Sequence, residues 1–382
     1  MALRESFTIL IICVASFKSA LCIADERIWL EARINGKSVR LCFDSGSSVS
    51  ALFPATMAKL GLKFIPGPTN DFYPCVLAGH TEDCTLVLEG TKGKASFLVL
   101  DLPAYVSADV DGLIGWWTLR NNILQIDAVA REVTFFPKLP TEAMQWARLS
   151  SLTNSETLEL QVAHGDRTNG VLCVDTGSDR GLALPEREWR RWREAHPKNP
   201  VTLQTAFTPS DGFFVHEEAW ADQISVGPIV ITGVPIAEAG PALATKWGAQ
   251  YEGTLGLAGL KRLDLIVDGN KGLVYLRPKK TRPSRYPHNR LGAIFVPTDE
   301  HTNQAVARVV DGGPAYEAGV RDGDVLVQVD GVMVTSWSES WLKRFSRTAG
   351  TKLKLKLNRD GKIFNTTATL REILKPSPRE NK

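Results

Sequence analysis

Two short segments of the chain place an aspartate before a small hydroxyl residue and a glycine. The sequence DSG occupies residues 44–46 and DTG occupies residues 175–177. In both segments an apolar run ends at the aspartate, and the glycine permits a tight turn that would push the carboxylate out of a sheet edge. Carboxyl groups are frequent acids and bases in catalysis. Asp44 and Asp175 are therefore the candidate catalytic residues.

The chemistry available to such a pair depends on how close the two carboxylates lie. Two carboxylates a few ångströms apart cannot both ionise cheaply, so they hold one proton, with one pKa lowered and the other raised. The ionised member can deprotonate a water that attacks an amide carbonyl. The protonated member can donate a hydrogen bond to the developing oxyanion. A facing pair thus predicts hydrolysis without a metal or cofactor.

Both triplets belong to an internal duplication. LCFDSGSSVSALFP (Leu41 to Pro54) matches LCVDTGSDRGLALP (Leu172 to Pro185) at an offset of 131 residues (175 against 44). A second block, Asp111 to Pro137, matches Glu252 to Pro278 without a gap at an offset of 141 (256 against 115). One triplet can arise by chance in an ordinary composition, but two in register within a repeat are strong evidence. We expect two lobes that face each other about a pseudo-twofold axis.

Short β-strands are expected to position the aspartates. Apolar runs bounded by Gly, Asn, Asp and Pro are typical of antiparallel strands. In the first repeat these runs are Ile28 to Ile34, Val39 to Phe43, Thr85 to Leu88, Ala95 to Leu100 and Val133 to Phe136. One short helix is expected after Pro54 and another after Pro185, because proline suits a first helical turn.

These motifs resemble the pepsin and retropepsin superfamily of aspartic peptidases. Each triplet is followed some seventy to eighty residues later by two mainly apolar residues and a glycine, Leu113-Ile114-Gly115 and Thr254-Leu255-Gly256. In that superfamily this glycine lets a strand pass closely behind the aspartate turn. Because the lobes are short, the likeness is nearer to two fused retroviral-type lobes. It implies a mainly β fold, two tandem retropepsin-like lobes and polypeptide substrates.

The resemblance also assigns roles to residues around Asp44 and Asp175, which would be catalytic. The hydroxyl residue after each aspartate would bond to the other lobe, the glycine would allow the turn, and the next serine would bond an outer carboxylate oxygen. These supporting residues are Ser45, Gly46, Ser47, Thr176, Gly177 and Ser178. The chain departs from the family pattern at Ser45, where Thr is usual, and at Thr254, which replaces an aliphatic residue. A flap over the cleft is expected between Phe72 and Thr85.

A third module follows a basic linker. Its segments are Arg290 to Ile294, Val306 to Val310, GGPAYEAGVRDGDVLVQVDG (Gly312 to Gly331), a helical stretch near Ser338 to Ser346, and strands Lys352 to Leu357 and Lys362 to Leu370. This order resembles a bacterial PDZ domain. A loop beside an exposed strand can offer N–H groups to a peptide carboxylate while the peptide adds a strand to the sheet. The residues expected to do so are Leu291, Gly292, Ala293 and Ile294. Peptide C-termini or exposed strands are the expected partners, and the alternative is a module that only packs on the peptidase.

The predicted organisation begins with a signal peptide at residues 1–24, because its apolar run of about eleven residues is too short to span a bilayer as a helix. An uncleaved anchor is the alternative, and a signal peptide implies export to the periplasm or the cell exterior. The remaining boundaries are lobe 1 at 25–140, a linker at 141–156 with a short helix around Ala143 to Leu149, lobe 2 at 157–280, a linker at 281–286, the PDZ domain at 287–374 and a tail at 375–382. No later apolar run is long enough for a membrane span.

Charge and cysteine content narrow the alternatives. The net charge is only +3 and the sequence has no long basic block, so nucleic acid is not an expected partner. Neither CxxC nor HExxH occurs, so no metal site is predicted. Cys75 and Cys84 lie nine residues apart and could form a disulfide across a hairpin if the protein is exported. Cys42 and Cys173 each precede a catalytic candidate by two residues.

The sequence therefore predicts a monomeric aspartic endopeptidase whose PDZ module recruits peptides or substrates. A second hypothesis is a non-catalytic peptide-binding or scaffold protein on the same fold. A third is that each lobe pairs with a lobe of another chain.

Overall fold

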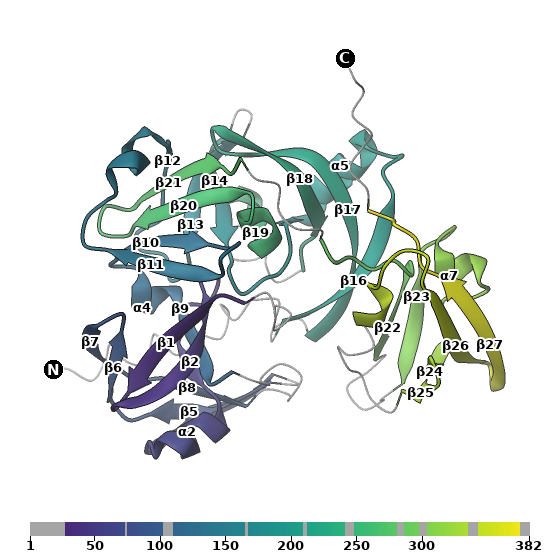
Figure 1. Cartoon of the computed structure of the whole chain (residues 1–382), viewed down its shortest axis with the longest axis horizontal. Coiled ribbons are helices and arrows are strands. Elements are labelled where there is room, and N and C mark those ends of the chain that lie inside the picture. Colours follow the sequence, from purple (N-terminus) through teal and green to yellow (C-terminus); the bar gives the residue numbers. More distant parts are fainter. Residues whose placement is uncertain are drawn as a thin grey trace.

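The computed structural model describes residues 27–72, 75–101, 110–164, 167–208, 212–240, 248–280, 286–297, 304–334 and 343–374. Within these ranges the chain is mainly β, as predicted, and its strands form four sheets (Figure 1). One sheet belongs to each repeat, one is shared by the two repeats, and one belongs to the C-terminal module. No helix among these residues is long and apolar enough to cross a membrane. The predicted signal peptide lies outside the described residues.

The first repeat forms a nine-stranded sheet in the order β4-β5-β8-β3-β9-β2-β1-β6-β7. Its strands are β1 (Trp29–Ile34), β2 (Lys37–Asp44), β3 (Ala51–Leu52), β4 (Phe64–Phe72), β5 (Cys75–Thr81), β6 (Cys84–Leu88), β7 (Thr91–Ala95), β8 (Leu98–Asp101) and β9 (Gly112–Gly115). Helix α2 (Pro54–Leu60) follows the first triplet, as predicted, and α4 (Trp116–Leu119) follows β9.

The second repeat forms a seven-stranded sheet in the order β13-β14-β19-β15-β18-β17-β16. Its strands are β13 (Glu159–His164), β14 (Arg167–Val174), β15 (Leu182–Leu184), β16 (Val201–Thr208), β17 (Gly212–Val226), β18 (Ile229–Glu238) and β19 (Tyr251–Leu255). Its helices are α5 (Glu186–Ala195), which follows Pro185 as predicted, η4 (Gly248–Gln250) and α6 (Leu257–Leu260).

The pairing of strands repeats between the two copies. Strand β2 runs parallel to β9, and β14 runs parallel to β19. Likewise β3 lies between β8 and β9, as β15 lies between β18 and β19. The duplication seen in the sequence is therefore a duplication of topology, and each copy delivers its aspartate at the end of an equivalent strand.

A shared five-stranded sheet joins the repeats in the order β11-β10-β20-β21-β12. It contains β10 (Ile123–Asp127), β11 (Glu132–Phe136), β12 (Ala147–Ser150), β20 (Leu263–Asp268) and β21 (Leu273–Pro278). The ladder between β10 and β20 links one copy directly to the other. Backbone hydrogen bonds therefore restrict how the two lobes can move relative to each other.

The helix predicted around Ala143 to Leu149 is shorter than expected. A 3₁₀ helix, η2, covers Thr141–Gln145 and is followed by strand β12. Residues Ala147 to Ser150 pair with β21, so this part of the chain joins the shared sheet as a strand and does not continue the helix. Tertiary pairing has overridden local helix propensity here.

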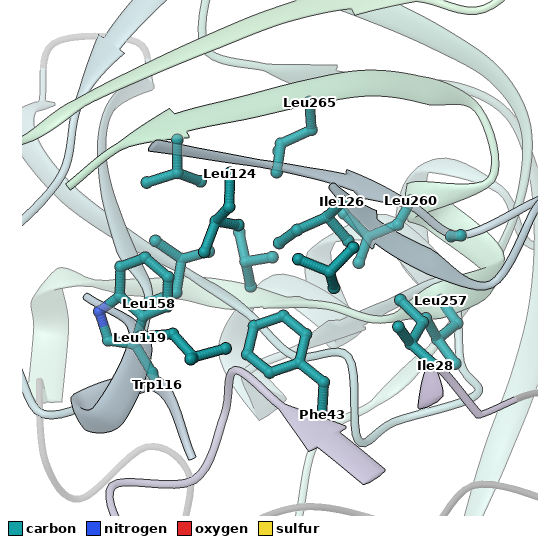
Figure 2. Close-up of a cluster of buried hydrophobic side chains, with 14 of the residues drawn as sticks. Ile28, Phe43, Trp116, Leu119, Leu124, Ile126, Leu158, Leu257, Leu260 and Leu265 are labelled. Atoms are coloured by element: carbon teal, nitrogen blue, oxygen red, sulfur yellow. The ribbon is translucent and has the colours of Figure 1, made fainter. Parts of the chain in front are cut away.

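One continuous hydrophobic core lies under both lobes and the shared sheet (Figure 2). Phe43, which directly precedes the first aspartate, is fully buried among side chains such as Leu119, Leu124 and Leu257. Burial of a side chain of this kind contributes about 1.5–3 kcal/mol to the free energy of unfolding. The strand end that carries Asp44 is thus held by the core of both repeats.

The C-terminal module has its own core and a six-stranded sheet in the order β22-β23-β24-β26-β27, with β25 paired to β24. Its elements are β22 (Ala293–Pro297), β23 (Ala305–Val309), α7 (Pro314–Glu317), β24 (Val325–Val329), β25 (Val332–Met333), β26 (Lys352–Arg359) and β27 (Lys362–Thr369). The helix predicted near Ser338 to Ser346 lies largely outside the described residues.

One prediction about strands in the first repeat is wrong. The run Ala95 to Leu100 is broken into β7 and β8, because Phe97 turns inward and its N–H donates to Thr81 Oγ1 at 3.0 Å. A hairpin of β4 and β5, Phe64 to Thr81, overlaps the segment between Phe72 and Thr85 in which a flap is expected, and the flap itself stays a prediction.

The predicted disulfide between Cys75 and Cys84 is also wrong. Cys84 is a free, buried thiol that donates to Ala95 O at 3.1 Å. Cys75 opens β5 opposite Phe72, whereas Cys84 opens β6 beyond the other end of β5. At about 3.3 Å per residue, the strand between them separates the two residues by roughly 20 Å, far beyond disulfide reach.

Candidate active site

The turn that carries Asp44 is closed from behind by β9. Asp44 pairs with Gly115 in the parallel ladder between β2 and β9. A Cβ atom at Gly115 would lie 2.3 Å from Val49 O, so only glycine allows this approach. The N–H of Trp116 then donates to Ser47 O at 2.9 Å and fixes the turn to the strand behind it.

The turn that carries Asp175 is built in the same way. The N–H of Asp175 donates to Leu255 O at 2.9 Å, and a Cβ atom at Gly256 would lie 2.6 Å from Arg180 O. Thr254, the departure from the family pattern, is buried and its hydroxyl is bonded to Tyr251 Oη at 2.6 Å. The polar atom is therefore satisfied, and the second glycine strand keeps its position.

Hydrogen bonds between Ser45 and Thr176 join the two turns reciprocally. The Ser45 N–H donates to Thr176 Oγ1 at 2.9 Å, and the Thr176 N–H donates to Ser45 Oγ at 3.0 Å. Each hydroxyl also donates across the boundary, Ser45 Oγ to Val174 O at 2.7 Å and Thr176 Oγ1 to Phe43 O at 2.8 Å. Both residues are fully buried. The serine in the first triplet thus makes the same set of bonds as the threonine in the second.

The two aspartates lie on the turns that touch each other. In each turn the glycine N–H donates to its own aspartate, Gly46 to Asp44 Oδ1 at 3.0 Å and Gly177 to Asp175 Oδ1 at 2.8 Å. A Cβ atom at Gly46 would lie 2.5 Å from Asp175 Cγ, so the second carboxylate packs directly on the first turn. Each aspartate is 4% exposed. The arrangement provides two neighbouring, mostly desolvated carboxyl groups.

Ser47 and Ser178 bind the backbone of their own loops. The Ser47 hydroxyl donates to Val49 O at 3.0 Å, and Ser178 Oγ accepts the N–H of Arg180 at 3.4 Å. Both residues are buried. Their predicted bonds to the outer carboxylate oxygens stay predictions.

Cys42 lies beside the dyad but is a poor nucleophile. Burial raises the pKa of its thiol to about 12; Arg27 opposes this shift, while the charges of Asp44 and Asp175 add to it. A thiol with this raised pKa stays protonated at neutral pH. Because only the thiolate is strongly nucleophilic, Cys42 is a poor nucleophile. Among the described residues, no group of three or more His, Cys, Asp and Glu side chains is arranged to hold a metal ion. The two carboxyl groups remain the candidate reactive groups of the site.

A buried polar cluster that sequence reasoning missed lies behind the second aspartate. Arg180 Nη2 and His216 Nδ1 are 3.3 Å apart, and burial, followed by the nearby Arg180 charge, lowers the His216 pKa well below its usual value. In the same cluster Glu218 accepts hydrogen bonds from Tyr286 Oη and from Gln204 Nε2. His216 and Glu218 lie two residues apart on β17, so their side chains share one face of the sheet. In the sequence this spacing stands among other polar residues. The cluster connects the Asp175 loop to the residues that precede the third module.

Glu218 should make stability depend on pH. Burial raises its pKa from 4.5 to about 7 although Tyr286, Gln204 and Arg180 oppose the shift; the charge of Asp179 raises it further. Because the folded-state pKa is raised, the folded state is favoured when the carboxyl is protonated, and this contribution is lost as pH rises from about 4.5 through 7. Glutamine does not titrate, so it avoids this loss. We predict that the difference in the free energy of unfolding between Glu218→Gln and wild type is more favourable to the variant at pH 8 than at pH 5, by roughly 2 kcal/mol. Urea unfolding of both proteins at the two pH values measures this difference, and an equal effect at both pH values would contradict it.

The residues predicted to bind peptides lie at the start of β22. Leu291, Ala293 and Ile294 are buried, and Gly292 has a φ of +67° that favours glycine. The Leu291 carbonyl accepts the N–H of Ala315, which ties this loop to α7. The four residues thus form one continuous loop and strand start, and their predicted binding of peptides stays a prediction.

Comparison with known proteins agrees with this description. Residues 30–116 match the family model described as aspartyl protease, and residues 306–359 match the model described as PDZ domain. Among solved structures, one match is the crystal structure of the retroviral protease-like domain of Ddi1 from Leishmania major. That match has 20% sequence identity, covers 30% of this chain and 94% of that chain, and has a TM-score of 0.25. The resemblance stated from the sequence agrees with the two family models: residues 30–116 are similar to the aspartyl protease family and residues 306–359 to the PDZ domain.

Proposed function

We propose that this protein is an aspartic endopeptidase in which Asp44 and Asp175 hydrolyse peptide bonds through an activated water. The observation that supports this best is the reciprocal bonding of Ser45 and Thr176, which presses the two aspartate turns together within one chain. The Asp175 carboxylate then lies against the turn that presents Asp44. Two such carboxyl groups, nearly desolvated, are expected to share one proton.

The reaction follows from that shared proton. The ionised carboxylate takes a proton from water as the water oxygen forms a bond to the amide carbon. The protonated carboxyl group gives a hydrogen bond to the carbonyl oxygen, which gains negative charge. When the carbon–nitrogen bond breaks, the proton taken from water passes to the leaving nitrogen. The site needs a peptide in extended form, and unfolded or exported polypeptides are the substrates that we propose.

The PDZ domain recruits peptides in this proposal, through their C-termini or through an exposed strand that adds to its sheet. The proposed site of action is the periplasm or the cell exterior, on the basis of the apolar N-terminal segment. The two halves of the dyad come from one chain and are joined by the β10 and β20 ladder, which supports a monomer. A native mass measurement distinguishes a monomer from a pair of chains that exchange lobes.

The test is cleavage by residues 25–382 of an unfolded polypeptide such as reduced casein, measured from pH 3 to pH 8. We expect cleavage that a statine-type transition-state mimic inhibits. The rival hypothesis, a non-catalytic scaffold, is favoured by the low exposure of both aspartates, 4% each, because a blocked cleft would also hide them. Absence of both cleavage and mimic binding across this range would support the rival.

A further inference from the structure

The predicted peptide-binding edge of the PDZ sheet is its first strand, β22. This strand ends the sheet order and has β23 as its ladder partner. The Gly292 carbonyl accepts the N–H of Val310 on the β23 side. Because polar groups of successive strand residues point to opposite sides, the C=O of Ala293 points away from β23. An added peptide strand would therefore bond at Ala293 and the loop before it.

Asn289 occupies these bonding positions. Its Oδ1 accepts the Leu291 N–H at 2.9 Å, and its Nδ2 donates to Ala293 O at 2.8 Å. The same Nδ2 also donates to Leu203 O at 2.8 Å, and Leu203 belongs to β16 of the second lobe. In addition, the hydroxyl of Thr202 donates to the Asn289 carbonyl at 2.8 Å. Asn289 therefore binds the PDZ edge and the protease lobe at once.

The space between β22 and β16 is too small for a peptide. Since one nitrogen atom bonds to both Ala293 O and Leu203 O, these oxygens lie less than two hydrogen-bond lengths apart. A strand inserted between two others needs their axes to be about 9.6 Å apart, twice the 4.8 Å spacing of one pair, whereas Cα atoms of β16 and β22 already lie within 8 Å of each other. Figure 1 shows β16 beside β22 in this arrangement. At this end of the edge, a peptide and lobe 2 exclude each other.

We propose that the PDZ domain is held in a closed state by lobe 2, and that a peptide with a free C-terminal carboxylate opens it by displacing Asn289 and β16. This inference rests on the proposed function because it takes the PDZ domain to recruit peptide substrates, and it adds how that recruitment is regulated. The contacts of Thr202 and Asn289, together with the hydrogen bond from Tyr286 to Glu218, form a clamp between the two domains.

Opening the clamp would also change the surroundings of the active-site loop. Glu218 would lose its Tyr286 partner, and β17 carries both Glu218 and His216. His216 bonds to Arg180, whose N–H donates to Ser178 Oγ three residues after Asp175. Peptide binding at the PDZ edge is thus connected to the second catalytic turn through contacts between neighbouring residues.

The test compares peptide binding in closed and weakened clamps. All proteins carry Asp175→Asn, so that the probe is not cleaved, and span residues 25–382. The probe is a pool of fluorescein-labelled decapeptides with a free C-terminal carboxylate and three varied final positions, followed by anisotropy. We expect the double variant Thr202→Val and Tyr286→Phe to bind at least about 10-fold more tightly than the unmodified clamp, because the open form is more populated. Thr366→Val, which removes a hydroxyl bond to Ala318 O inside the PDZ domain, is the matched control and should leave affinity unchanged.

Hydrogen exchange provides a second readout. Binding of the probe should raise amide exchange of residues 201–208 in β16, whereas the same pool with amidated C-termini should not. Equal affinities for the unmodified clamp and the double variant, or no binding by either, would overturn the proposal, and so would binding that leaves β16 protected. None of these readouts requires cleavage, so an inactive dyad would not affect them.

Discussion

Asp44→Asn and Asp175→Asn should each lower kcat for peptide cleavage by at least about 1000-fold. An asparagine keeps the Oδ1 atom that accepts the glycine N–H in each turn, so the turn itself should persist. It cannot, however, exchange a proton with water or share one with the other carboxylate. The expected result is a large loss of kcat with a melting temperature close to that of wild type, measured with a fluorogenic peptide and by circular dichroism.

Two comparisons sharpen this prediction. Asp83→Asn changes an exposed aspartate in the loop between β5 and β6 and should leave kcat unchanged. The double variant at 44 and 175 should be no more impaired than either single variant, because the two groups act as one unit. Turnover in either single variant within 10-fold of wild type would show that the dyad does not perform the reaction.

The duplication made the candidate pair predictable from the sequence. Each aspartate ends an apolar strand, and the offset between the copies places the two in equivalent positions of one repeated topology. The later glycines were informative because a Cβ atom at Gly115 or Gly256 has no room beside the aspartate loop. This steric requirement for glycine is local and recurs in both copies, so it is visible in the sequence as a repeated glycine.

Features that depend on long-range pairing were predicted less well. Strand β12 forms because β21 offers an edge more than a hundred residues later, and the local sequence favours a helix there. The spacing of Cys75 and Cys84 suggested a bridge, yet β5 runs its full length between them. The pattern of one strand does not reveal which other strand will lie beside it.

The cluster around Glu218 and the clamp at Asn289 were not predicted for a related reason. Their members come from β16, β17, the Asp175 loop and the residues before the PDZ domain. Polar residues in such positions are indistinguishable in sequence from solvated ones, because burial results from the docking of whole domains. Only the structure shows that a domain boundary reaches the Asp175 loop.

Thr176→Val should lower the free energy of unfolding by about 2–6 kcal/mol, because each buried polar group left without a partner costs about 1–3 kcal/mol. Valine has nearly the shape of threonine but lacks Oγ1. Its introduction leaves the Ser45 N–H and the Phe43 carbonyl without the bonds that now span the lobes. Both groups lie in fully buried surroundings. Because these bonds position the two turns, kcat should fall as well, even in the fraction of protein that stays folded.

Thr176→Ser is the control that separates the hydroxyl from the methyl group. It keeps both bonds of Oγ1 and should retain most of the stability and turnover, as Ser45 already performs the same task in the first lobe. Urea unfolding of the two variants, together with kcat at a temperature where both are folded, measures the difference. If valine and serine at position 176 were equally destabilising, keeping the hydroxyl would not preserve stability, and the hydrogen bonds of Thr176 Oγ1 would not explain the effect. If valine were tolerated within about 0.5 kcal/mol, a typical limit for changes away from such features, the two turns would be held together by the shared sheet and core instead.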